Sequence, residues 1–107
     1  MKGLFELCRT LKKVKVDVAK ITKAYLDEYN ETGTDIAYEK HLYWAGFLEE
    51  LQYNVNLIEA GEHATLQQLK ERSAVALWHM DRHKDNPVIQ GHIDMLYLIK
   101  DFEPMEG

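Results

Sequence analysis

Three polar side chains that could do chemistry lie close together on one predicted helix: Arg72, His79 and His83. At about 100° per residue they project within roughly 40° of one another, on the flank of the apolar face of that helix. His79 and His83 stand at positions i and i+4, the spacing that lets two imidazoles reach one metal ion. A third ligand would be needed, such as His92 or Asp81. We therefore keep His79 and His83 only as alternative metal ligands and expect no metal or other cofactor.

Arg72 and His79 also permit a second chemistry, the cleavage of RNA. A histidine can serve as a general base, and a fixed cation beside it can stabilise phosphate charge. The segment RSAVALWH, which begins at Arg72 and ends at His79, resembles the Arg-x(4–6)-His motif of the HEPN family of small helical-bundle ribonucleases. The resemblance covers these eight residues and implies that the histidine acts on the attacking 2′-hydroxyl while the arginine steadies the phosphate, usually across a dimer. The alternative is a surface arginine and histidine that flank the core.

Aromatic and acidic side chains concentrate where the first two predicted helices meet. Exposed aromatic residues are good anchors for a protein partner, and acidic residues beside them would suit a basic surface on that partner. We predict a partner-binding surface here, with a solvated helix end as the alternative. The candidate residues are Tyr29, Tyr38, Tyr43, Asp35 and Glu39.

Basic side chains gather at the start of the chain. Residues 1–23 hold seven lysines and arginines against Glu6 and Asp17, a net charge of +5, although the whole chain carries −5. Such a basic face can be a solvated surface beside acidic neighbours, or it can bind phosphates. The residues expected on it are Arg9, Lys12, Lys13, Lys20 and Lys23.

The elements that must position these side chains are predicted to be helices. Apolar residues recur at alternating steps of three and four through residues 4–28, which predicts a long helix over 2–31 with a narrow apolar seam. The same spacing of apolar residues predicts a second helix over 35–61. Gly33 and a cap at Thr34 or Asp35 make a short turn, so the two helices are antiparallel. The seam residues are Leu4, Leu7, Leu11, Val14, Val18, Ile21 and Tyr25, then Ala37, His41, Trp44, Leu48, Leu51, Val55 and Ile58.

A shorter pair of helices is predicted over 65–85 and 87–103. Thr65 and Gln68 fit a capping box, and Asn86 followed by Pro87 begins the last helix. Gly91 costs that helix about 1 kcal/mol of propensity. The predicted fold is all-α, an antiparallel bundle of about four helices in a single domain spanning residues 1–107. The last helix is apolar around most of its circumference, so we expect it to leave apolar surface for a homodimer or another partner.

The composition is that of an ordinary globular protein, with 46% hydrophobic and 29% charged residues. Cys8 is the only cysteine, which favours a reducing compartment. No apolar stretch approaches the roughly 18 residues of a membrane span. We therefore expect a cytoplasmic protein without membrane contact.

Three functions remain open, in a fixed order of preference. The first is a small non-enzymatic protein-binding or regulatory module of the inhibitor, immunity, antitoxin-like or phage accessory type. The second is a metal-independent ribonuclease that uses Arg72 and His79. The third is a nucleic-acid-binding protein that uses the basic face of the first helix.

Overall fold

The computed structural model describes residues 2–61 and 65–104, and these ranges contain four α-helices, one short 3-10 helix and no strand. Helix α1 spans Lys2–Thr32, α2 spans Asp35–Glu59, α3 spans Leu66–Met80 and α4 spans Pro87–Lys100, with the 3-10 helix η1 at Asp81–His83. The predicted all-α bundle is confirmed. The third predicted helix is shorter than expected, because the chain tightens into η1 after Met80. None of the described helices combines the length and apolar character of a membrane-spanning segment.

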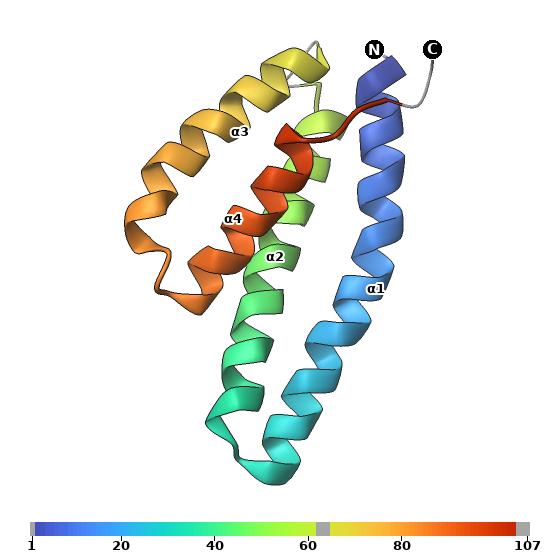
Figure 1. Cartoon of the computed structure of the whole chain (residues 1–107). Coiled ribbons are helices and arrows are strands. Elements are labelled where there is room, and N and C mark those ends of the chain that lie inside the picture. Colours follow the sequence, from blue (N-terminus) through green and yellow to red (C-terminus); the bar gives the residue numbers. More distant parts are fainter. Residues whose placement is uncertain (1, 62–64, 105–107) are drawn as a thin grey trace.

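Helices α1 and α2 form the predicted long antiparallel hairpin (Figure 1). Gly33 takes a φ of 66°, a left-handed conformation that favours glycine, and so ends α1. The Thr34 hydroxyl then accepts a hydrogen bond from the Ala37 amide at 3.4 Å and caps α2. Thr65 caps α3 and Asn86 caps α4 by the same kind of bond, as predicted.

The helices are not arranged as two equal hairpins side by side. Helix α4 packs chiefly on α2, α1 packs on the same α2, and α3 lies on the outer side of α4 (Figure 1). The main core lies among all four helices at the end where the chain termini lie, and a smaller cluster joins α3 to α4. Fully buried members of the main core are Leu7, Leu11, Leu51, Leu69, Met95 and Ile99, and the smaller cluster contains Leu77, Ile93 and Leu96.

The apolar surface expected on the last helix is covered within the chain. Ile93, Met95, Leu96 and Ile99 are all buried, and Tyr97 is the one large apolar side chain of α4 that stays exposed among the described residues. The expectation that α4 leaves a broad apolar face for a partner is therefore wrong. The physical reason is its position between α2 and α3, which uses both sides of the helix.

The hairpin projects past the other two helices. The molecule measures 47 × 29 × 25 Å with a radius of gyration of 14.8 Å, compared with about 13 Å for a compact domain of this length. At about 1.5 Å per residue, α1 alone is long enough to span the long axis. Helices α3 and α4 are much shorter and stop before the α1–α2 turn (Figure 1). Side chains near that turn therefore have only one neighbouring helix to cover them.

Two glycines bring α2 and α4 into direct backbone contact. A Cβ added at Gly91 would lie 2.0 Å from the carbonyl oxygen of Tyr43 and 2.7 Å from the amide nitrogen of Phe47. A Cβ added at Gly46 would lie 2.1 Å from the carbonyl oxygen of Val88. These distances are far below van der Waals contact, and the atoms that would clash are backbone atoms that cannot rotate away. Both helices must therefore carry glycine where they cross.

We predict that Gly46→Ala and Gly91→Ala each lower the free energy of unfolding by about 3 kcal/mol, measured by urea denaturation followed by circular dichroism. Overpacking against backbone outweighs the gain in helix propensity of about 1 kcal/mol. Gly3→Ala is the matched control, because its added Cβ would meet the flexible end of the Leu66 side chain at 3.0 Å. An alanine at position 91 that left stability unchanged would contradict this close contact.

Candidate functional site

The exposed end of the hairpin carries large apolar side chains together with acidic side chains. The Tyr29 and Tyr38 rings pack against each other with centroids 4.9 Å apart across the turn. Ile36 is 67% exposed and Tyr38 is 43% exposed, although both are large apolar side chains. Asp35 and Glu39 are exposed on the same first turns of α2. We call Tyr29, Asp35, Ile36, Tyr38 and Glu39 the tip surface.

Hydrogen bonds hold the turn beneath the tip surface. The Gly33 amide donates to the Tyr29 carbonyl at 2.7 Å, and the Thr32 hydroxyl donates to the Glu28 carbonyl at 2.8 Å. The Thr34 amide donates to the Thr32 hydroxyl at 3.3 Å. The exposed aromatic and aliphatic side chains are thus carried by a turn with a defined backbone, which limits the entropy lost on binding.

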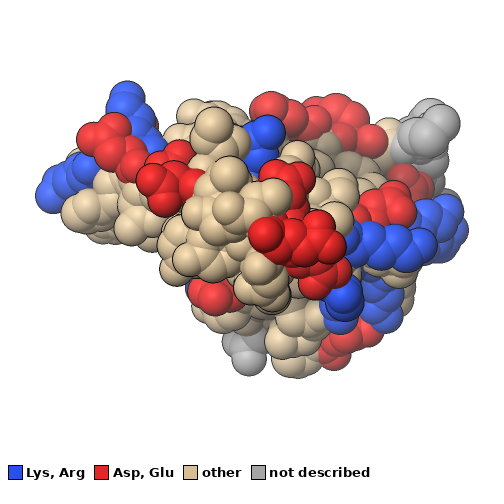
Figure 2. All heavy atoms as spheres, turned by 90° about the horizontal axis from the view of Figure 1, so that it is seen from below, with Lys and Arg blue, Asp and Glu red and all other residues tan. Residues whose placement is uncertain are grey.

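A shallow hollow of about 330 Å³ adjoins the tip surface. It lies between the start of α2 and the turn that leads into α4, and its lining mixes apolar and charged side chains. Figure 2 looks onto this end of the molecule and shows acidic side chains set among uncharged surface, with most of the visible basic side chains toward the left and right edges. The lining residues are Ile36, Glu39, Lys40, Tyr43, Lys84, Asp85, Pro87 and Gln90.

Tyr43, one of the five predicted partner-binding residues, is turned toward α4. Its hydroxyl donates a hydrogen bond to Asp94, which also accepts one from the Gln90 amide at 3.0 Å. Burial raises the pKa of Tyr43, and the bond to Asp94 raises it further. Tyr43 therefore forms the floor of the hollow and joins α2 to α4, whereas the other four predicted residues belong to the tip surface. Ile36 was not among the predicted residues, although its position off the apolar seam and beside the cap could have indicated exposure.

Arg72 and His79 do not form a shared site, because each side chain contacts a different aromatic residue. The Arg72 guanidinium donates to the Tyr53 hydroxyl and lies over that ring, 5.0 Å from its centroid. The His79 ring packs edge-on against Trp78 at a centroid distance of 5.0 Å. His83 lies in η1, beyond the end of the α-helix that carries His79. In the part of the chain that the structure describes, no group of three or more potential metal-binding side chains occurs.

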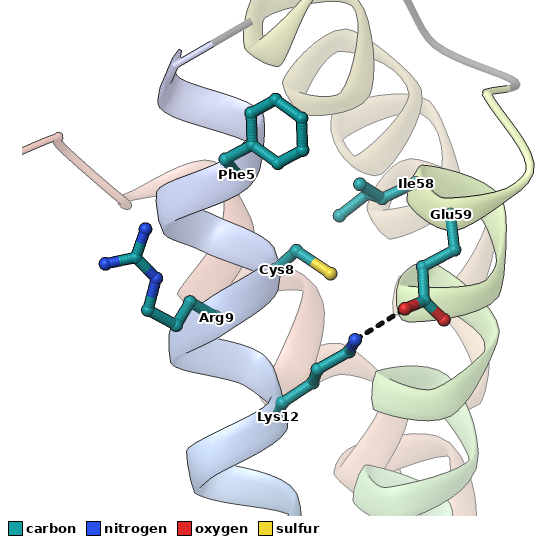
Figure 3. Close-up of a pocket in the computed structure, with 6 residues that line it drawn as sticks. All are labelled: Phe5, Cys8, Arg9, Lys12, Ile58 and Glu59. Atoms are coloured by element: carbon teal, nitrogen blue, oxygen red, sulfur yellow. Dashed lines mark ion pairs between the residues drawn. The ribbon is translucent and has the colours of Figure 1, made fainter.

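The basic face of α1 is exposed, and two of its lysines have acidic neighbours. Lys12 Nζ lies 2.5 Å from a carboxylate oxygen of Glu59 on α2, and Lys23 pairs with Asp27 at 2.8 Å. Figure 3 shows Lys12 and Glu59 beside a hollow of about 630 Å³ between α1 and α2, with Arg9 pointing away from α2. Cys8 points into this hollow, and burial raises the pKa of its thiol, so the thiol stays protonated at neutral pH. Cys8 is therefore not activated as a nucleophile.

A buried polar cluster lies between α2 and α4, and it was not predicted from the sequence. His92 Nδ1 lies 2.8 Å from Glu50 Oε1, and Asn54 donates to the other oxygen of that carboxylate at 2.6 Å. Glu50 is only 6% exposed. His41, on the apolar seam of α2, also has a polar partner, because its Nδ1 lies 3.1 Å from the Thr22 carbonyl oxygen. Nothing local marked Glu50 as buried, because its partner His92 lies 42 positions away on α4.

The Glu50 hydrogen bond raises the pKa of His92 above its ordinary value of 6.5, against the opposing effect of burial, and Glu49 adds to the rise. A folded-state pKa above the unfolded one means that the protonated form stabilises the fold. This stabilisation is complete below about pH 6.5 and is lost as the pH rises through the folded-state value.

We expect the urea concentration at the unfolding midpoint of the wild type to decrease as the pH rises from about 6 to about 9. The decrease should be much smaller in His92→Gln. His41→Gln is the control, because the partner of His41 is a backbone carbonyl and not a carboxylate. A wild-type decrease that persists unchanged in His92→Gln would show that the Glu50–His92 pair does not titrate in this range.

Comparisons of the chain with protein-family models, with curated proteins and with solved structures find no match. The tip surface, the hollow beside it and the buried Glu50–His92 cluster are thus the features from which a function can be inferred. Of these, the tip surface is the one that faces solvent with large apolar side chains.

Proposed function

We propose that this chain is a small non-enzymatic binding protein that docks its tip surface onto a basic surface of a partner protein. The proposal is carried by the exposure of Ile36 and Tyr38 at the start of α2, where Tyr38 packs on Tyr29 across the turn. We further propose a cytoplasmic location, which the single free and buried thiol of Cys8 supports.

The chemistry of the tip surface fits a protein partner. Aromatic side chains in the centre of an interface contribute most of the binding energy, and polar residues around them exclude water. Here Ile36 and Tyr38 supply exposed apolar side chains, and Asp35 and Glu39 supply carboxylates on the same first turns of α2. The exposed carboxylates favour encounter with a positively charged surface and raise the rate of association at low salt.

The environment of Arg72 and His79 favours binding over RNA cleavage. Each side chain engages a different aromatic neighbour, Tyr53 for Arg72 and Trp78 for His79. A general base and a phosphate-binding cation must converge on one substrate position. Because Arg72 and His79 contact separate neighbours, they do not converge on one substrate position within a single chain.

The tip surface can be tested with three immobilised proteins: the wild type, Ile36→Ala/Tyr38→Ala, and the control Val16→Ala, which removes an exposed apolar side chain from α1. We expect a stoichiometric protein from the source-cell extract to be retained by the wild type and the control but not by the tip variant. After identification by mass spectrometry, calorimetric titration of that purified protein should show at least about a 30-fold loss of affinity for the tip variant. Equal binding by the tip variant would overturn the proposal.

A second measurement addresses catalysis directly. We expect the wild type to leave a fluorescently labelled single-stranded RNA uncleaved over hours at a micromolar protein concentration without metal. Cleavage by the wild type that disappears in His79→Ala, with an unchanged helical circular dichroism spectrum, would establish the ribonuclease instead.

A further inference from the structure

A second exposed surface lies on the opposite side of the fold from α1, where α3 and α4 meet. Trp78 is 65% exposed and Tyr97 is 47% exposed. Val75, three residues before Trp78 on α3, is exposed as well. Large apolar side chains that gather on a surface usually mark an interaction site. A hollow of about 380 Å³ lies between the two helices, and we call it the Trp78 groove. Its lining includes Leu77, Trp78, Asp81, Arg82, Tyr97 and Lys100.

Each aromatic ring of the Trp78 groove has a cation over it. The Arg82 guanidinium lies 5.3 Å from the Trp78 ring centroid, and Lys100 Nζ lies 5.6 Å from the Tyr97 ring centroid. Neither cation forms an ion pair with any residue that the structure describes. Asp81 is the single carboxylate in the lining. The groove therefore combines two exposed aromatic rings with two cations that are free to pair with carboxylates.

A second copy of the chain does not suit this groove. Most protein dimers are related by a two-fold axis, which places the same surface on both sides of the interface. The shared interface would then hold Arg82 and Lys100 of both copies, offset only by their two Asp81 carboxylates. Such an arrangement brings like charges together in an apolar interface.

A nucleic acid is also a poor match. Proteins that bind nucleic acid tightly neutralise many phosphates, typically about six to ten. The Trp78 groove offers two cations on a molecule with a net charge of −5. Two cations would neutralise too few phosphates to hold a nucleic acid in the groove.

We propose that the Trp78 groove binds an acidic peptide segment of a partner protein. An apolar side chain of the segment packs on Trp78 and Tyr97, and flanking carboxylates pair with Arg82 and Lys100. Charge-assisted hydrogen bonds from an arginine to a carboxylate would fix the orientation of the segment. This surface differs from the tip surface in charge and in place, so it would serve a different partner or a different part of the same partner.

The intrinsic fluorescence of Trp78 provides a direct readout. In a Trp44→Phe background Trp78 is the sole tryptophan, because the chain contains two. The probe is a synthetic peptide of alternating glutamate and leucine, compared with a lysine–leucine peptide of equal length and with an oligothymidine of equal charge. We expect a saturable blue shift of Trp78 emission with the acidic peptide alone.

Charge reversal tests the role of the two cations. Arg82→Glu/Lys100→Glu should weaken binding of the acidic peptide at least about tenfold. Lys13→Glu/Lys20→Glu changes the net charge by the same amount on α1 and should leave the affinity within about twofold. Circular dichroism checks that each variant folds.

Several results would overturn the proposal. These are no blue shift with the acidic peptide, an equal loss of affinity in both charge-reversal variants, or preferential binding of the oligothymidine. Sedimentation that reveals a wild-type dimer, together with a Trp78→Ala monomer, would assign the groove to a second copy instead.

Discussion

The crossing of α2 and α4 at two glycines is the contact on which the rest of this fold depends. Without side chains at Gly46 and Gly91, the two backbones touch, and α4 lies deep enough to bury both of its sides. Helix α3 packs mainly on α4 and only secondarily elsewhere. The position of α3, and with it the Trp78 groove, is therefore set indirectly by the glycine crossing.

The Glu50–His92 pair acts with the glycine crossing to fix how α4 sits on α2. Glu50 lies one helical turn beyond Gly46, and His92 directly follows Gly91, so the polar pair lies next to the point of closest approach. A buried ion pair loses much of its attraction to desolvation and contributes little net stability. Its larger effect is on specificity, because sliding α4 along α2 would leave Glu50 buried without its partner.

Local signals made much of this fold predictable. Gly33, Thr34, Thr65 and Asn86 act within a few residues of themselves, so the sequence placed the helix starts and the first turn correctly. The apolar seam of α1 likewise needs no knowledge of the partner helix.

Features that depend on residues far apart in the chain were not predictable. Gly91 could be read only as a loss of helix propensity, because its benefit exists only when α2 lies against it. Burial of Glu50 and exposure of Trp78 have the same origin, since each depends on where another helix lies. For the candidate site, Asp35, Tyr38 and Glu39 are exposed and Tyr29 is half-buried, while Tyr43 bonds to an aspartate 51 positions away.

The projection of the α1–α2 hairpin past the shorter helices has a mechanical consequence. Toward the chain termini, three or four helices share one core, so opening that region exposes apolar residues from all of them. Near Gly33 the two helices support only each other, and their separation costs far less. The molecule therefore has a stiff end and a compliant end. The compliance lies in the separation of the two helices, because the backbone of the turn itself is held by its own hydrogen bonds.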